Sequence, residues 1–316
     1  MKAIVIRNFG PADVLQIEDV QIPVPDDHQV LVKVKAIGIN PVDTKVRAGG
    51  HTISKSLQFP AILGWDISGV IEVCGKSVTG YKPGDAVFGN LRFPDLGNGY
   101  AEYVIAYPSE IAIKPQGVTF EEAAALPVAG LTAYQALHDH LHIQPRQNIL
   151  IQAASGGVGH LAVQLAKIAG ATVYATASTT NRDFINSIGA DRYIDYTAEK
   201  FEDIISNYDC ALDAMGGEVL YRSISCVKNR GNVVCLPSST KNDPKAVELA
   251  QSKNINLVWP MMYKSIEQLA LLAALADKKK LKIYLHKVFP FDQMADAHRQ
   301  IETHHTRGKV VVTVDN

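Results

Sequence analysis

Polar and apolar residues alternate along the first 115 residues of the chain, and this period of two predicts short strands. In residues 29–37, QVLVKVKAI, valines occupy one face, and Lys33 and Lys35 occupy the other, as in a half-buried strand. Further strands of this kind are predicted at residues 2–7, 69–75, 85–90, 100–107 and 111–115. This part of the chain is therefore predicted to be mostly antiparallel β-structure.

The pattern changes near residue 120. Residues 120–137, FEEAAALPVAGLTAYQAL, have a helical pattern that is interrupted at Pro127. Beyond them, apolar strands are predicted at 149–154, 172–178, 193–196, 208–214 and 231–237, with helices at 160–170, 182–189, 200–206 and 219–228. Strands that alternate with helices at this spacing are typical of parallel βαβ units, so an α/β fold with a doubly wound parallel sheet is predicted. A helix at 266–279 and a strand at 309–314 follow this series.

A glycine-rich turn joins the first of these strands to its helix. Residues 149–159, ILIQAASGGVG, match the pattern G-x-G-x-x-G with Ala154 in the first glycine position, Gly156 in the second and Gly159 in the third. A helix N-terminus offers N–H groups and a positive dipole end to a phosphate, so the turn is predicted to bind the pyrophosphate of a dinucleotide. A plain strand-to-helix turn is the alternative. The predicted cofactor-binding residues here are Ala154, Ser155, Gly156, Gly157, Val158 and Gly159.

The end of the next predicted strand indicates which dinucleotide binds. It supplies Ser178, Thr179 and Thr180 and then Arg182, with no acidic residue before Asp183. A carboxylate there would bind the ribose hydroxyl of NAD, whereas hydroxyl groups and an arginine suit the 2′-phosphate of NADPH. NADPH is therefore favoured. The alternative is that Arg182 begins a helix that faces solvent.

Composition and charge exclude several classes of protein. With 316 residues, 47% hydrophobic and 20% charged, the chain is long and apolar enough for two folded domains. The formal net charge of -1 and the lack of a long basic run argue against binding to nucleic acid or to an anionic membrane. No signal peptide is evident, and no uninterrupted apolar stretch reaches the ~18 residues of a membrane span, so a cytoplasmic protein is expected.

Two sets of potential metal ligands are better explained without a metal. The four cysteines are widely spaced and lie in apolar or strand-like segments, which favours buried, reduced thiols. They are Cys74, Cys210, Cys226 and Cys235. Three histidines alternate in residues 138–142, HDHLH, where a surface turn is favoured over a metal site.

Several motifs together resemble those of a known family. LIQAASGGVGHLAVQLAK at 150–167 is similar to the signature of the zinc-independent quinone oxidoreductases, a group of the medium-chain dehydrogenase/reductase superfamily that includes zeta-crystallin. Four other motifs follow the superfamily's order: GINPVD at 38–43, GWDISGVIEVCG at 64–75, YKPGDAVFG at 81–89 and LPVAGLTAYQAL at 126–137.

The resemblance implies a domain organisation. It implies a GroES-like catalytic domain of residues 1–122, completed by residues 262–316, and a Rossmann domain that binds NADPH at residues 123–261. The active site would lie in the cleft between the domains, and a homodimer would be expected.

The resemblance also implies site residues. Tyr196 would join Ser178 and Arg182 at the 2′-phosphate. Zinc-dependent relatives have a cysteine where this chain has Asn40, and a histidine and a glutamate where it has Trp65 and Asp66. Since neither an amide nor an indole replaces thiolate and imidazole as a zinc ligand, no metal is expected.

Four residues are candidates for catalysis by the same resemblance. Asn40, Asp43 and Lys45 would come from one loop beside the cleft, and Thr132 would lie near the nicotinamide. Asn40 would donate a hydrogen bond to the substrate oxygen and Lys45 would stabilise negative charge there. The alternative is that Asn40 and Asp43 only cap the turn at Pro41.

Hydride transfer without a metal suits an acceptor that is already electrophilic, either a quinone or the C=C bond of an α,β-unsaturated carbonyl compound. Many quinone reductases of this type have tyrosine at the position of Lys45, and NPVDTK at 40–45 is more similar to the alkenal and enone reductases. A non-catalytic NADPH-binding protein, with a crystallin-like or RNA-binding role, is the alternative function.

Overall fold

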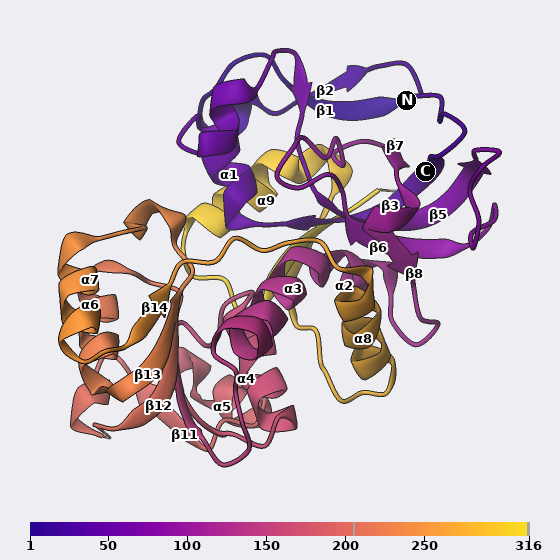
Figure 1. The fold of residues 1–316 in the computed structure, drawn as a ribbon. Coiled ribbons are helices and arrows are strands. Elements are labelled where there is room, and N and C mark those ends of the chain that lie inside the picture. The colour runs from indigo at the N-terminus through magenta and orange to yellow at the C-terminus, as the bar shows by residue number, and fades with distance from the viewer. Residues whose placement is uncertain (205, 315–316) are drawn as a thin grey trace. The chain divides into compact units, whose positions relative to one another are not determined.

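The computed structural model describes residues 1–204 and 206–314 and divides into two compact units (Figure 1). The first unit contains Met1–Leu131 and Tyr263–Asn316, and the second contains Thr132–Met262. Helix α2, Phe120–Ala125, packs on the strands of the first unit.

The first unit is built on two sheets. One has the order β2-β1-β4 and the other β15-β16-β3-β5-β6-β8, with β7 also paired to β3. Every strand pair is antiparallel except β15 with β16, so the predicted antiparallel character is confirmed. The strands are β1 (Lys2–Ile6), β2 (Gln16–Asp19), β3 (Val30–Ile39), β4 (Ala61–Ile62), β5 (Asp66–Cys74), β6 (Ala86–Asn90), β7 (Tyr103–Ala106), β8 (Ile111–Ile113), β15 (Leu285–Pro290) and β16 (Lys309–Thr313).

Pairing between distant parts of the sequence completes this unit. Strand β16 lies antiparallel to β3, with Val310 opposite Ile39, so residue 309 comes next to residue 40. The apolar side chains of both strands lie in one core. The helices of this unit are α1 (Pro41–Arg47), α2, α8 (Ile266–Asp277) and α9 (Met294–Glu302).

One glycine permits the close packing of α2 on β3. A Cβ on Gly38 would lie 2.1 Å from the carbonyl oxygen of Ala124. Only a residue without a side chain therefore lets strand and helix approach so closely, two residues before Asn40.

The second unit has one six-stranded sheet of order β11-β10-β9-β12-β13-β14, in which every pair is parallel. The predicted doubly wound fold is confirmed. The strand order changes direction at β9, which lies between β10 and β12, and ligands of such folds bind at the carboxyl ends of the strands at this point. Its strands are β9 (Asn148–Ile151), β10 (Thr172–Ala177), β11 (Arg192–Asp195), β12 (Tyr208–Asp213), β13 (Val227–Cys235) and β14 (Asn256–Val258), and its helices include α4 (Gly159–Ile168), α5 (Arg182–Ser187), α6 (Gly217–Cys226) and α7 (Pro244–Ser252).

One predicted helical segment agrees with the structure and another differs from it. The interruption at Pro127 is confirmed, since α2 ends at Ala125 and α3 runs from Pro127 to Gln135. The helix predicted at 200–206 is only a 3₁₀ turn, Phe201–Asp203, and residue 205 of that prediction lies outside the described residues. The turn is short because Phe201 is buried in the core and Glu202 pairs with Arg222 of helix α6.

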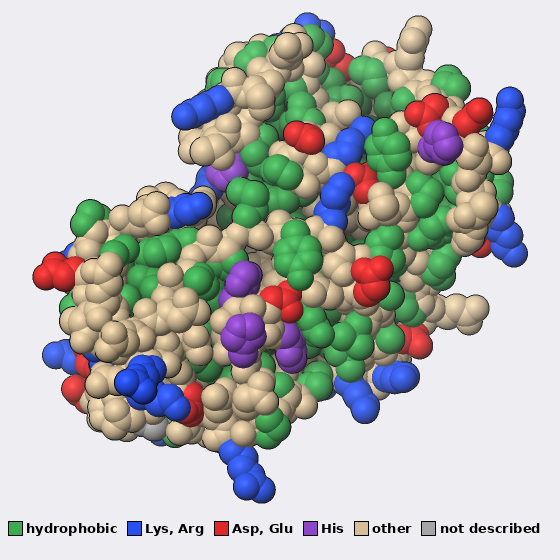
Figure 2. Space-filling model, in the orientation of Figure 1, with side chains coloured by type: hydrophobic (Ala, Val, Ile, Leu, Met, Phe, Trp, Pro, Cys, Tyr) green, Lys and Arg blue, Asp and Glu red, His purple; other side chains and the backbone are tan. Residues whose placement is uncertain are grey.

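The surface agrees with the near-zero net charge. On the face shown in Figure 2, basic and acidic side chains are scattered among one another and neither kind forms a continuous stripe. In the part of the chain that the structure describes, no helix combines the length and the apolar character that crossing a bilayer requires.

Candidate active site

A buried carboxylate, that of Asp66 at the start of β5, accepts hydrogen bonds from three elements of the first unit. The side-chain amides of Asn40 and Asn90 donate to it at 2.9 and 3.0 Å. The backbone N–H of Val128, in the first turn of α3, donates to its two oxygens at 3.1 and 3.2 Å. The pKa of Asp66 is raised by burial, and the charge of Lys309 and these donors oppose that rise only in part. Since all these hydrogen-bond neighbours are donors, the arrangement suits the ionised carboxylate.

Both ends of the Asn40 amide are held. Its nitrogen donates to Asp66, and its oxygen accepts from the ammonium group of Lys309. Lys309 also donates to the carbonyl of Ile39 at 2.9 Å. An ammonium group has only donors and an ionised carboxylate only acceptors, so the two ends of the amide cannot exchange places. Asn40 is only 2% exposed, and its side chain is therefore fixed inside the unit. We call Asn40, Asp66, Asn90 and Lys309 the Asp66 cluster.

Asp43 caps the start of helix α1. Its Oδ2 accepts the backbone N–H of Asn40 at 2.6 Å, so the turn cap expected here is present. Its Oδ1 has no hydrogen-bond partner among the described residues. Burial raises the pKa of Asp43 to about 7, and the charge of Asp66 acts in the same direction while that of Lys309 opposes it. The carboxyl group therefore changes its protonation state near neutral pH.

A chain of buried polar groups leads away from Asp43. Arg47 pairs with Glu302 and donates to Nδ1 of His298 at 3.2 Å. Because a guanidinium group cannot accept, the neutral imidazole carries its hydrogen on Nε2 and donates to the Tyr100 hydroxyl at 2.9 Å. The charge of Asp43 raises the pKa of Tyr100, after the larger effect of burial. Burial, followed by the charge of Arg47, lowers the pKa of His298 to about 3.

Lys45 and Thr132 lie on the two helices that begin at the Asp66 cluster. Lys45 is exposed on α1, and after burial its charge is the second cause of the lowered pKa of His51. Thr132 is half-buried on α3, four residues after Val128 and thus on the same side of the helix. The structure therefore brings Asn40 and Asp43 together in one unit with Lys45, while Thr132 is the first residue of the other unit.

The side chains at the positions where zinc-dependent relatives have ligands make contacts within the protein. The indole nitrogen of Trp65 donates to the carbonyl of Asp95 at 2.6 Å, and its ring packs edge-on against Phe93. Residues Ala136–His140 form a π-helical turn, and His138 stacks on Tyr134 with ring centres 4.3 Å apart. Within residues 1–204 and 206–314, no three His, Cys, Asp or Glu side chains are placed to hold a metal ion.

The glycine-rich turn of the second unit connects β9 to α4. A Cβ on Gly159 would lie 2.3 Å from the carbonyl oxygen of Ala153, so strand and helix approach closely there. Ala153 itself has a φ of 50°, which places the left-handed residue of the turn next to Ala154, where the first glycine is missing. Residues 155–158 are half-exposed at the helix N-terminus, which leaves their backbone accessible to a phosphate.

Side chains beneath this turn are joined in a buried network. The side chain of Gln152 accepts from Thr176 at 2.6 Å and donates to Ser223 at 3.1 Å. Ser223 donates to Asp213, which also accepts the N–H of Gly216 at 2.7 Å. This network connects the carboxyl ends of β9, β10 and β12 and holds the floor of the predicted pyrophosphate site.

The residues predicted at the 2′-phosphate meet at one corner of the same unit. Ala177 pairs with Asp195 in the sheet, so Ser178 and Tyr196 follow at the same level on neighbouring strands. Tyr196 is 57% exposed, and Arg182 begins α5 with its guanidinium 5.4 Å from the centre of the Tyr193 ring.

The acidic residue at this corner is engaged elsewhere. Asp195 accepts from the hydroxyls of Thr179 and Thr197, both at 2.6 Å, and these hydrogen bonds lower its pKa to about 2. Asp195 keeps its negative charge but is only 3% exposed, whereas Arg182 is exposed. The surface of the corner therefore offers hydroxyl groups and a cation to a phosphate, which fits NADPH.

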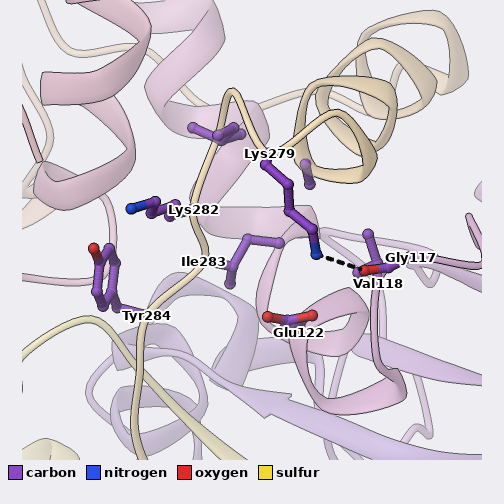
Figure 3. Close-up of a pocket in the computed structure, with 9 residues that line it drawn as sticks. Gly117, Val118, Glu122, Lys279, Lys282, Ile283 and Tyr284 are labelled. Atoms are coloured by element: carbon purple, nitrogen blue, oxygen red, sulfur yellow. Dashed lines mark hydrogen bonds between the residues drawn. The ribbon is translucent and has the colours of Figure 1, made fainter.

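A hollow of about 300 Å³ elsewhere in the first unit contains none of the predicted site residues (Figure 3). Figure 3 shows the Lys279 ammonium pointing to the Gly117 carbonyl, which it reaches at 3.3 Å. Glu122, also in its lining, accepts the N–H of Thr119 as part of a helix cap. These groups have local structural partners, so we assign the hollow no role in the candidate site.

Sequence reasoning missed Lys309 and the hydrogen bonds of Asp66. Both residues are the charged positions of mostly apolar strand segments, KVVVTV and GWDISGV, and this is the signal that could have identified them. The tertiary pairing of β16 with β3 that joins them has no counterpart in the local pattern.

Comparisons with known proteins agree with this architecture. A family model described as the alcohol dehydrogenase GroES-like domain matches residues 26–129, and one described as zinc-binding dehydrogenase matches residues 188–312. The NADPH-dependent alkenal/one oxidoreductase of Arabidopsis thaliana chloroplasts is 35% identical over 99% of this chain and 79% of its own length. The chloroplastic quinone-oxidoreductase homolog of Spinacia oleracea is 33% identical over 96% and 95%.

Solved structures give the same result. The quinone oxidoreductase of Coxiella burnetii has a TM-score of 0.94 and 39% identity, covering 100% of this chain and 99% of its own. The Escherichia coli quinone oxidoreductase in complex with NADPH has a TM-score of 0.89 and 26% identity, covering 99% and 100%.

Replacement of His298 by Gln should reduce the loss of stability on acidification. The pKa of this histidine is about 3 in the folded protein and 6.5 in the unfolded chain, so between these values the unfolded state binds more protons. The stability that the neutral imidazole contributes is present above pH 6.5 and is lost as the pH falls, by about 2 kcal/mol between pH 7 and pH 5. Glutamine can keep both hydrogen bonds and does not titrate.

Urea unfolding of the wild type and His298→Gln at pH 7 and pH 5 measures this difference. The raised pKa of Asp43 acts in the opposite direction in both proteins and cancels in the comparison. The same pH dependence in both proteins would show that His298 does not resist protonation in the folded state.

Proposed function

The chain belongs to the quinone oxidoreductase and alkenal/one oxidoreductase family of the medium-chain dehydrogenase/reductase superfamily, and from this membership we propose that it transfers a hydride from NADPH to quinones or to the C=C bond of α,β-unsaturated carbonyl compounds. The observation that carries the proposal is that the positions where zinc-dependent relatives have ligands hold an amide and an indole, both hydrogen-bonded within the protein. The Asn40 amide is held by Asp66 and Lys309, and the Trp65 indole donates to a backbone carbonyl. A site of this kind favours an acceptor that needs no metal to become electrophilic.

We propose that the first unit is the catalytic domain and the second the NADPH-binding domain. NADPH supplies the hydride when it is bound. The turn at residues 154–159 would hold its pyrophosphate, and Ser178, Arg182 and Tyr196 would hold its 2′-phosphate. The half-exposed backbone of the turn and the exposed cation of Arg182 support these assignments.

Lys45 is our candidate for stabilising negative charge on the acceptor oxygen. It is exposed, so its ammonium group is accessible to a substrate, in contrast to Asn40 and Asp43. The burial and the hydrogen bonds of those two residues favour a supporting role, in which they fix the start of α1. Thr132, on helix α3, is proposed to lie at the nicotinamide.

The names of the relatives do not support the non-catalytic alternative, since those reported above are oxidoreductases or are named as homologues of one. A cytoplasmic location stays a prediction, because the relatives include chloroplastic proteins.

We also propose a homodimer. Strand β14 ends the six-stranded sheet, and its outer edge has no strand partner in the described part of the chain. Met261, three residues beyond this strand, is 61% exposed, so an apolar side chain lies close to a free sheet edge. Light scattering on the purified protein should give about twice the chain mass of 34.3 kDa, whereas a mass of one chain would contradict the dimer.

NADPH oxidation with a panel of acceptors tests the activity. Naphthoquinones and short alkenals or enones should be reduced, and ethanol with NADP⁺ should give negligible turnover, because conjugation spreads the incoming charge without help from a metal. The activity should persist in a chelator. Rapid alcohol oxidation, or activity that depends on added zinc, would contradict the proposal, and NADPH binding with no turnover of any acceptor would favour the non-catalytic alternative.

Replacement of Arg182 by Ala should weaken NADPH binding about tenfold or more and leave NADH nearly unchanged. A charge-assisted hydrogen bond contributes about 1.5–3 kcal/mol, and only NADPH carries the 2′-phosphate. Dissociation constants from fluorescence titration measure both cofactors. Arg192→Ala is the matched control, since Arg192 lies at the opposite end of β11 and pairs with Glu199. An equal loss for both cofactors in Arg182→Ala would remove Arg182 from the phosphate site.

A further inference from the structure

The Asp66 carboxylate connects the starting points of two helices. On one side it holds Asn40, the residue before α1, and on the other it accepts the N–H of Val128 at the start of α3. Its remaining donor, Asn90, is the last residue of β6. A single buried group thus fixes the relative placement of α1, β6 and the first turn of α3.

Lys309 completes this arrangement from the other end of the sequence. As the first residue of β16, it donates to the carbonyl of Ile39 and to the amide oxygen of Asn40. Asp66 and Lys309 therefore hold opposite ends of one amide, and their charges balance inside the unit. Both side chains are almost completely buried, so solvent does not weaken the interaction.

Stability alone is a poor explanation for this cluster. Removing two charges from water costs free energy that their attraction only partly offsets, and apolar residues of similar size commonly serve as well. The hydrogen bonds of the cluster do define orientation, because they hold both ends of the Asn40 amide and both oxygens of Asp66. Among the described residues, only Oδ1 of Asn90 in this cluster has no partner. The two helices that it orients carry Lys45 and Thr132, the residues proposed for the acceptor oxygen and the nicotinamide.

We propose that Asp66 and Lys309 are positioning residues for hydride transfer, which set the start of α1 and of α3 through Asn40 and the N–H of Val128. The inference rests on the proposed function and deepens it. Both residues are buried, so the proposal gives neither a contact with substrate or cofactor. They act through the helices that they fix, and small displacements of reacting groups are expected to lower the turnover more than they weaken binding.

Asp66→Asn tests the carboxylate. The new amide places N–H groups against donors that need an acceptor, so at least one hydrogen bond is lost. We expect kcat with an enone to fall between about tenfold and a hundredfold. The dissociation constant of NADPH should stay within about twofold, because the cofactor groups lie in the second unit.

Asp85→Asn is the matched control. Asp85 is a half-buried carboxylate of the same unit that accepts a backbone N–H, from Lys82 at 2.9 Å, outside the proposed site. It should lower the melting temperature without lowering kcat. An unchanged kcat in Asp66→Asn, or a fall of the same size in Asp85→Asn, would overturn the proposal.

A second pair of variants keeps the test decisive if Asp66→Asn does not fold. Lys309→Met removes the charge. Its kcat should fall by at least the factor by which its KM for the acceptor rises. Lys309→Arg keeps a charged donor and should have a higher kcat than Lys309→Met. Equal activity of Lys309→Met and the wild type would contradict the inference.

The proposed function can fail separately, if the wild type reduces no quinone or enone with NADPH. In that case hydrogen exchange decides the structural part. Segment 41–47 and the Val128 amide should exchange faster in Lys309→Met than in the wild type, and unchanged exchange would exclude a positioning role.

Discussion

The first unit depends on a buried negative charge at Asp66 that only the folded chain can neutralise. Its donors come from residues 40, 90 and 128, and the balancing ammonium comes from residue 309. None of these groups is close to the others in sequence, and an unpaired charge in this position would be strongly unfavourable. The unit is therefore complete only when β16 pairs with β3. The chain leaves the first unit at Leu131 and returns to it at Tyr263 to supply that strand.

The second unit meets a different requirement, which is to bring backbone close to an anion. The close approach at Gly159 and the left-handed turn at Ala153 bend the chain sharply after β9. The network from Thr176 to Asp213 fixes the strand ends beneath that turn without placing a charge on its exposed side. Asp195 is buried and held by two threonine hydroxyls, so the exposed charge at this corner is the Arg182 cation that a phosphate requires.

The sequence predicted those features that depend on local patterns. Alternation of apolar residues located the strands of both units, and the glycine spacing located the turn at 154–159. Pro127 marked the break between α2 and α3 because proline cannot donate within a helix. The prediction of a helix at 200–206 was wrong over the described residues. There, burial of Phe201 and the pairing of Glu202 with Arg222 outweigh the local preference for helix.

Long-range contacts could not be predicted in this way. Asn40 carried a catalytic expectation from its family position, but its burial and its bonds to Asp66 and Lys309 arise from the meeting of β3, β5 and β16. The direction of the hydrogen bonds from Arg47 through His298 to Tyr100 likewise follows from tertiary geometry. The hydrogen-bond partner of each imidazole nitrogen decides which nitrogen carries the hydrogen. Residue type alone predicts neither the contacts of Asn40 nor the nitrogen of His298 that carries hydrogen.

The central claim is that this chain delivers the nicotinamide hydride to conjugated carbon and not to a carbonyl carbon. Isotope transfer tests it most directly: an enone is reduced with NADPH deuterated at either of the two C4 positions, and the product is examined by NMR. The account predicts deuterium on the carbon β to the carbonyl from one of the two labelled cofactors, with the carbonyl retained. Deuterium on the carbonyl carbon of an allylic alcohol, or no transfer from either label, would contradict it.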